Sequence, residues 1–202
     1  MKISFPQFLW DLLPGATAPK SPPSRDPGST AGGSSRPGPA RRRPGSGRTT
    51  ARQERYDELV REMKRIHGLR VNKWRSSTSG CAWEVHYRDG SRSRLIESPY
   101  PRGPMSCAVF MHEVGHHAIG LHRYRPRCLE EYHAWKWGLE EMEARGFSVT
   151  ERVLKRRDDA LRYAVAKAVR RGLRRLPVEL EAWAPPGLFV STGSASGEHV
   201  DQ

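Results

Sequence analysis

The spacing of hydrophobic residues predicts a helix and then a strand at the start of the regular part of the chain. Large apolar side chains recur every three or four positions, at Tyr56, Leu59, Val60, Met63 and Ile66. Thr50 and Gln53 have the spacing of a capping box that would start this helix, and Gly68 offers a left-handed stop. Residues 69–75 alternate weakly, which indicates a strand.

A hairpin is expected next. Residues 82–88 alternate clearly, with one face formed by Trp83, Val85 and Tyr87. Asp89-Gly90 is typical of a two-residue hairpin turn. Residues 91–97 would return as the partner strand, with Ile96 opposite Trp83.

The second half of the chain is predicted to be helical. Ser106 is a suitable N-cap for a helix that runs to about Gly120. Hydrophobic periodicity indicates two more helices, over residues 128–146 and 148–175. A helix, two or three strands and further helices define an α+β fold.

Glycine, proline and serine are concentrated outside these elements. Residues 14–50 consist mostly of these three types and contain no bulky apolar residue, so they cannot bury enough surface to offset the entropy lost on ordering. We therefore predict a disordered N-terminal tail and linker at residues 1–50, a folded domain at 51–176 and a largely irregular C-terminal segment at 177–202.

The charge of the 202-residue chain is strongly basic, at +13. This favours acidic partners, nucleic acid among them, although a solvated basic surface explains it equally well. Within residues 151–175, one side of the predicted helix carries basic residues that could contact phosphates, at Arg156, Lys167, Arg170 and Arg174.

The location predicted from the sequence is cytoplasmic. The three cysteines cannot all pair within one chain and form no CxxC motif, which fits a reducing compartment. No uninterrupted apolar run has the length of a secretory signal or a membrane span, so no membrane contact is predicted. The oligomeric state is left open.

The chemistry is concentrated at residues 111–120, which contain His112-Glu113-Val114-Gly115-His116. On a helix, positions i and i+4 lie about 40° apart, so His112 and His116 can hold one metal ion. Two imidazoles suit Zn²⁺, and the adjacent Glu113 can accept a proton from a metal-bound water. This is the HExxH pattern of zinc peptidases, with coincidental surface histidines as the alternative.

A catalytic zinc ion normally has a third protein ligand. In the predicted helix 128–146, Glu131 lies at the centre of an apolar face, where an unpaired carboxylate would be costly. This position favours Glu131 as the third ligand. Pairing of Glu131 with Arg123 or Arg127 is an alternative. Glu130, at the edge of the face, and His133, on the opposite side at about 200°, are weaker candidates for the ligand.

The order of elements resembles the zincin class of metallopeptidases, in which a small antiparallel sheet packs against the HExxH helix. HExxH followed by Glu131-Tyr132-His133-Ala134 is closest to the ImmA/IrrE type, in which the glutamate of an E-x-x-A pattern completes the zinc site. The SprT type, with a histidine as third ligand, is the other relative. The resemblance implies a zinc endopeptidase that acts on a protein or peptide, such as a DNA-bound regulator.

Two functional hypotheses follow. In the first, His112, His116 and Glu131 hold zinc, Glu113 is the general base and residues 91–97 hold the substrate backbone as an edge strand. In the second, the chain is a basic module that binds nucleic acid or protein on a catalytically inactive zincin-like scaffold. The intact Glu113 favours the first hypothesis, because a purely structural metal site needs no adjacent base.

Overall fold

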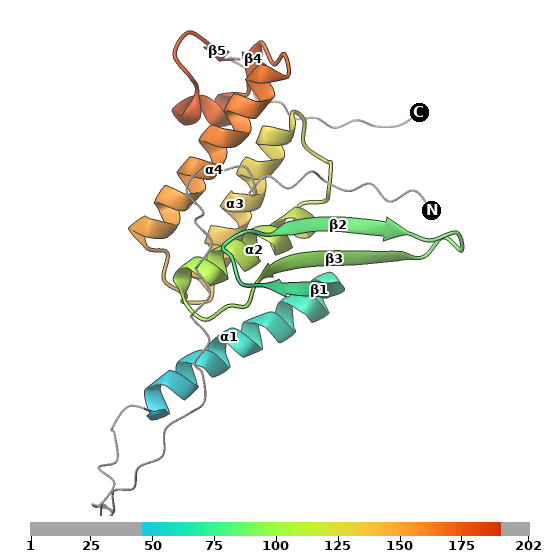
Figure 1. Cartoon of the computed structure of the whole chain (residues 1–202), viewed down its shortest axis with the longest axis vertical. Helices are drawn as coiled ribbons and strands as arrows, with labels where there is room; N and C mark the ends of the chain where they lie inside the picture. The colour runs from blue at the N-terminus through green and yellow to red at the C-terminus, as the bar shows by residue number, and fades with distance from the viewer. Residues whose placement is uncertain (1–45, 191–202) are drawn as a thin grey trace, which may run out of the picture.

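The computed structural model describes residues 46–190, with side chains at residues 51–188, and has an α+β fold (Figure 1). The elements in order are α1 (Ser46–His67), β1 (Leu69–Arg75), β2 (Cys81–His86), β3 (Arg92–Pro99), α2 (Pro104–Ala118), α3 (Arg127–Ala144), α4 (Glu151–Arg170), β4 (Arg175–Leu176), the 3-10 helix η1 (Val178–Trp183) and β5 (Phe189–Val190). Of the tail and linker predicted at residues 1–50 and the C-terminal segment predicted at 177–202, residues 1–45 and 191–202 lie outside the described residues.

The main sheet has three strands in the order β1-β3-β2. β2 is antiparallel to β3, as the hairpin predicts, but β1 is parallel to β3. The prediction of an antiparallel sheet is therefore corrected to a mixed one. Since β3 is the central strand, the prediction that residues 91–97 form an edge strand is also wrong. The alternation of apolar and polar residues along a strand indicates which face of the strand is buried, but it does not show which strands are its neighbours. This explains both errors.

The hairpin is shifted by one residue from its predicted register, because Trp83 faces Leu95 and Ala82 faces Ile96. The turn contains three residues instead of two. The N–H of Gly90 donates to the carbonyl of Tyr87 (3.2 Å), and Gly90 has a φ of 83°. This is a type I turn followed by a left-handed residue, and the extra residue shifts the register. Ala82 and Ile96 are consequently the buried pair.

The helix starts also differ from prediction. α1 begins at Ser46, so Thr50 lies within it, and Gln53 donates to Asp57 Oδ1 (2.7 Å) instead of closing a capping box. In α2, Pro104 follows Gly103 at the N-cap, and Ser106 lies inside the first turn, where its Oγ accepts from the Gly103 N–H (3.2 Å). The fixed φ of proline suits the first helical position, and this moves the start ahead of Ser106.

The layers place α2 at the centre of the fold. α2 packs on β3 and β2, α1 contacts α2 and β1, and α3 lies between α2 and α4 (Figure 1). The largest side chains of the core are fully buried, among them Met63, Ile96, Phe110, Met111, Trp135 and Leu161. Of the helices in residues 46–190, none has an apolar stretch long enough to cross a bilayer.

α4 is shorter than the helix predicted over 148–175. It starts after Thr150, whose side chain accepts from the Val153 N–H (3.4 Å). It ends at Arg170, and Gly172 has a φ of 94°, which turns the chain out of the helix. Arg174 therefore lies beyond the helix on which it was predicted.

Candidate metal centre

The HExxH segment forms the second half of α2 and is buried on all sides. His112, Glu113 and His116 are each 1–2% exposed, so they are not surface residues. One nitrogen or oxygen from each lies within 4.8 Å of the others, close enough for a shared ion. The His112 ring stacks on Trp135 with a centroid distance of 4.4 Å, which fixes the plane of the ring.

Glu131 of α3 reaches the same point. Its Oε2 lies 3.3 Å from His112 Nε2 and 3.6 Å from His116 Nε2. Two ligands at about 2.0–2.1 Å from a tetrahedral zinc ion are roughly 3.3 Å apart. The two imidazoles and the carboxylate thus have the chemistry and the spacing of a zinc site with three protein ligands.

Two glycines let α2 and α3 approach closely enough for this convergence. A Cβ atom on Gly115 would lie 2.6 Å from the Ala134 carbonyl oxygen, and one on Gly138 would lie 3.0 Å from the Met111 backbone. Any side chain at either position would push the helices apart. Gly115 lies inside the HExxH motif, so the motif supplies the close contact as well as the ligands.

A second carboxylate orients one imidazole. His116 Nδ1 lies 3.2 Å from Glu130 Oε1, which leaves its Nε2 facing Glu131. Arg127 links both acids, with Nη1 3.0 Å from Glu130 Oε1 and Nε 3.1 Å from Glu131 Oε1. The predicted alternative of a Glu131–Arg127 pair is thus present alongside the imidazole contacts. Glu130 faces the outer nitrogen of His116, the usual place of a residue that orients a ligand.

Charge and burial shift the pKa values of Glu131 and the two imidazoles in opposite directions. Burial would raise the pKa of Glu131, but the charge of His116 and hydrogen bonds from both imidazoles hold it well below its usual range. Burial would also lower the pKa of His116, but Glu131 and Glu130 raise it to about 9. Burial lowers the pKa of His112 to about 4. Glu131 is therefore ionised at neutral pH, as a metal ligand must be.

Glu113 lies on the sheet side of the site, against the loop between β1 and β2. A Cβ atom on Gly80 would lie 2.4 Å from Glu113 Oε1, so only glycine leaves room for this carboxylate. Glu113 Oε1 has no hydrogen-bond partner among the described residues. Burial raises the pKa of Glu113 to about 8. Such a carboxylate is a stronger base than an exposed one.

The other histidines and tyrosines near the motif have different partners. His133 stacks on Tyr124 with a centroid distance of 4.0 Å, and no hydrogen bond or ion pair between described residues joins it to His112 or His116. His117 Nε2 lies 3.1 Å from the Leu95 carbonyl oxygen and fixes α2 to β3. Tyr132 lies beside Trp183. Only Glu131 among the predicted third ligands contacts both imidazoles, while Glu130 contacts His116 alone.

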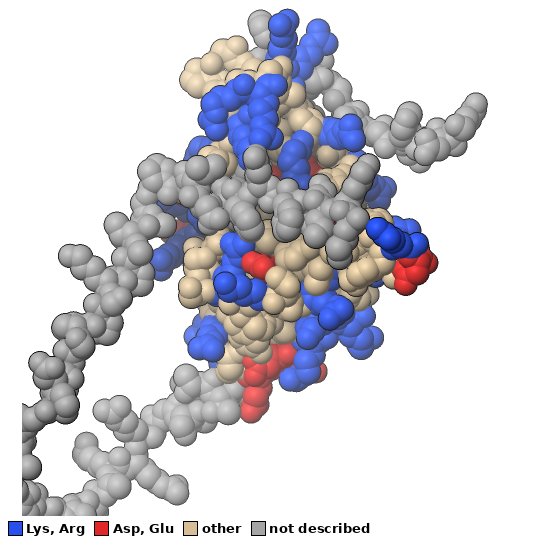
Figure 2. Space-filling model, turned by 45° about the vertical axis from the view of Figure 1, so that its right-hand side comes forward, with Lys and Arg blue, Asp and Glu red and all other residues tan. Residues whose placement is uncertain are grey.

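The basic residues that were predicted along one helix face do not form a single surface. Arg156 donates to the Thr78 carbonyl (3.1 Å), and Lys167 lines a cavity between α3 and α4. Lysine and arginine side chains instead gather where α4 ends (Figure 2). The exposed arginines of this cluster, here called the terminal arginine cluster, are Arg170, Arg171, Arg174 and Arg175.

Comparison with known proteins identified no relative: no family model, curated protein or solved structure matches the chain.

Two features around the proposed ligands were not predicted from the sequence. They are the contact of Gly80 with Glu113 and the ion pair of Arg127 with Glu130. Gly80 gave no signal, because its contact with Glu113 joins distant parts of the chain. Arg127 was predicted as a partner of Glu131, but its second ion pair, with Glu130, was not. Since Arg127 precedes Glu130 by three positions, a spacing at which helical side chains meet, that pair could also have been predicted from the sequence.

Proposed function

We propose that the protein is a zinc-dependent peptidase with a zincin-like arrangement, in which His112, His116 and Glu131 hold the metal. The observation that carries the proposal is the convergence of Glu131 Oε2 on both Nε2 atoms, at 3.3 and 3.6 Å, from a separate helix. Two nitrogens and one oxygen are a ligand set used by catalytic zinc, which keeps a fourth position for water.

The residues around the site have distinct roles in this proposal. Zinc, when bound, supplies a Lewis acid that acidifies its water and polarises a carbonyl. Glu113 accepts the proton of the attacking water and passes it to the leaving amine. Glu130 holds His116 with its Nε2 toward the ion. Because Glu113 is buried, bulk water cannot reach the proton that its carboxylate carries.

Substrate binding by strand addition is assigned to β2 in place of residues 91–97. β2 is an edge strand of the three-stranded sheet. Its first residue, Cys81, follows Gly80, whose Cα lies against the Glu113 carboxylate. A peptide added along this edge would run past the proposed base, with main-chain hydrogen bonds supplying affinity.

The metal content of purified protein tests the proposal most directly. We expect about one zinc ion per chain in the wild type and nearly none in His112→Ala, since the variant loses one of three ligands. His122→Ala, at an exposed histidine four residues beyond α2, is the matched control and should retain zinc. Elemental analysis and digestion of a peptide library measure the two outcomes. Undiminished zinc in His112→Ala, or a wild type without zinc or cleavage, would contradict the proposal.

The terminal arginine cluster supports a second candidate function, contact with nucleic acid. Exposed arginines attract backbone phosphates, and each phosphate contact steepens the dependence of binding on salt. Elsewhere on α4, Lys155 and Arg162 pair with Asp159, and Arg157 pairs with Asp158.

Replacing Arg170, Arg174 and Arg175 together by glutamine is expected to reduce the slope of log K against log salt by about one per arginine. The matched control replaces three exposed basic residues of α1, Arg61, Lys64 and Arg65. Fluorescence anisotropy with a labelled DNA duplex measures both. Equal losses in the two variants would mean that the cluster is not the binding surface.

A further inference from the structure

The outer face of the three-stranded sheet, opposite α1 and α2, carries a cluster of apolar side chains. The inner face, on which α2 packs, holds the buried pair Ala82 and Ile96. Because side chains alternate along a strand, the neighbours of this pair point the other way. They are Trp83 on β2 and Leu95 on β3, which lie opposite each other, and Val85 follows Trp83 on the same face. We call these three residues the outer cluster.

The outer cluster is separate from the hydrophobic core and reaches an edge of the sheet. Its three side chains are half-buried, and none belongs to or packs against the core formed by the described residues. β2 is an edge strand, so one row of its backbone N–H and C=O groups faces away from β3. The side-chain row from Leu95 to Trp83 ends at this edge. A peptide that paired with β2 would extend the row, because directly opposite residues point to the same face.

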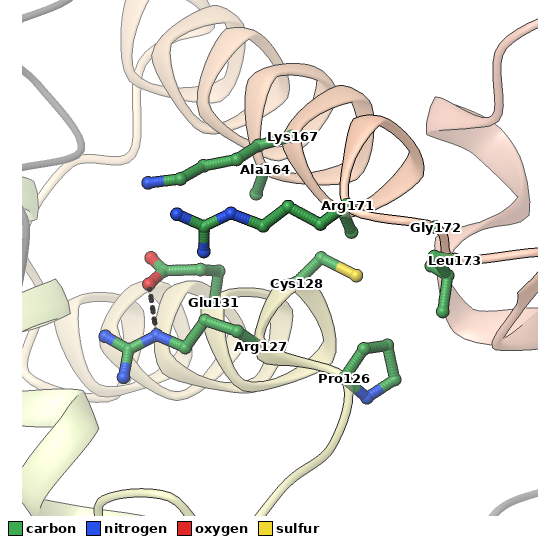
Figure 3. A pocket seen from close by; sticks show the side chains of 10 residues that line it. Pro126, Arg127, Cys128, Glu131, Ala164, Lys167, Arg171, Gly172 and Leu173 are labelled. Carbon is green, nitrogen blue, oxygen red and sulfur yellow. Dashed lines mark hydrogen bonds and ion pairs between the residues drawn. The ribbon is translucent and has the colours of Figure 1, made fainter.

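The two sides of the proposed metal site offer different groups to a substrate. On the α4 side, Glu131 lies among basic side chains, and its Oε1 accepts a hydrogen bond from Arg127 Nε at 3.1 Å (Figure 3). On the sheet side, Gly80 lies against Glu113 and leads directly into β2. An extended peptide can form main-chain hydrogen bonds only on the sheet side, where there is a strand edge. Trp83 and Val85 follow along this edge, roughly 7 Å apart.

We propose that the outer cluster selects substrates that have large apolar side chains at two positions separated by one residue. The proposal rests on the proposed peptidase function, with strand addition at β2, and specifies its substrate class. The peptide residues opposite Trp83 and Val85 would lie on the outer face beside these side chains. Aromatic and β-branched side chains that pair across strands stabilise a sheet, and removing apolar surface from water adds to this.

The peptide residue between these two positions has polar surroundings. It would lie opposite Glu84 and point to the inner face of the sheet. Glu84 Oε1 accepts from Arg94 Nε at 3.1 Å, and its Oε2 lies 3.5 Å from His86 Nε2. An apolar side chain beside this charged group would gain little from burial. The substrate pattern is therefore apolar, polar, apolar.

Two peptides of identical composition test this spacing. Each contains two phenylalanines in an otherwise polar sequence, either separated by one residue or adjacent to each other. Both are titrated by calorimetry into zinc-loaded Glu113→Gln protein, in which turnover is prevented. We expect the separated arrangement to bind about fivefold more tightly, because only this arrangement places both rings on the outer face and one cross-strand pair contributes up to about that factor. Equal affinities, or no measurable binding of either peptide, would overturn the inference.

Variants of Trp83 locate the effect. Trp83→Ser should reduce the preference to about twofold or less, whereas Trp83→Phe should retain most of it. Thermal unfolding checks that both variants fold, as we expect for a side chain outside the core. The matched control is Trp74→Ser, at a partly exposed tryptophan on the opposite edge strand β1, and Ile66→Ser, at an exposed residue of α1, is a second control. Both controls should keep the preference. A preference that survives in Trp83→Ser, or is lost only in Trp74→Ser, would contradict the proposal.

Pairing with a second copy of the chain is another outcome of these measurements, since a free strand edge can also join two sheets. Sedimentation of the wild type and of Trp83→Ser detects it. A dimer that dissociates in the variant, with no spacing-dependent peptide binding, would assign the outer cluster to self-association and overturn its role in substrate selection.

The peptidase proposal and the outer-cluster proposal fail in different ways. If the wild type cleaves no peptide but the separated arrangement still binds more tightly through Trp83, the peptidase function is wrong and the recognition surface remains. If both peptides are cleaved and bound equally, the function remains and the outer cluster does not select the substrate.

Discussion

Replacing Glu113 by glutamine is expected to lower kcat/KM for peptide hydrolysis by about 10²- to 10⁴-fold, the usual contribution of a general base. Glutamine has almost the same shape as glutamate, so it fits beside Gly80, but it cannot accept the proton of the attacking water. Zinc content should stay at the wild-type level, because Glu113 is not among the three proposed ligands. Steady-state hydrolysis of a fluorogenic peptide and elemental analysis measure the two quantities.

Glu58→Gln provides the control for this variant. Glu58 is an exposed acid on α1, and the same change of charge there should leave hydrolysis intact. Full turnover by Glu113→Gln would remove this residue from the mechanism. Loss of zinc together with activity would instead make Glu113 part of the metal site.

Gly115→Ala is expected to destabilise the fold by about 1–3 kcal/mol and to weaken zinc binding, because the added Cβ would clash with a backbone carbonyl of α3. The clash distance, 2.6 Å to the Ala134 oxygen, cannot be relieved by rotating a side chain. Within a helix, alanine is more stable than glycine by about 1 kcal/mol. A net loss of stability in Gly115→Ala would therefore be caused by the clash and not by helix propensity. Urea denaturation and chelator competition provide the two measurements.

Gly103→Ala is the control for the glycine variant. A Cβ atom at this position meets nothing within 4 Å, and its φ of −169° is open to any residue. Its free energy of unfolding should change by less than about 1 kcal/mol. If Gly115→Ala were as stable as Gly103→Ala and bound zinc as tightly, the close approach of α2 and α3 would not be needed for the site.

Helix periodicity made the centre of the site predictable. The apolar face around Glu131 is buried as expected, and it includes Ala134, Trp135, Gly138, Leu139 and Met142. The i, i+4 spacing of His112 and His116 likewise fixed their common direction once α2 was helical. These inferences use only neighbours along one helix. They needed no knowledge of how distant segments pack.

The sheet was harder to predict because its details depend on distant contacts. The bulky Trp83 suggested the buried face of β2, but the three-residue turn brings Ala82 opposite Ile96 instead. Nothing in residues 69–75 shows that β1 pairs with β3 in the parallel direction. The contact of Glu113 with Gly80 also joins segments far apart in the sequence.

The contact between Gly80 and Glu113 has a consequence for how related sequences should vary. Because a methyl group at position 80 would occupy the space of the carboxylate, glycine is obligatory only while the glutamate is retained. We expect descendants that keep the glutamate to keep the glycine, and lineages that have replaced the acid with a smaller residue to drift freely at both positions.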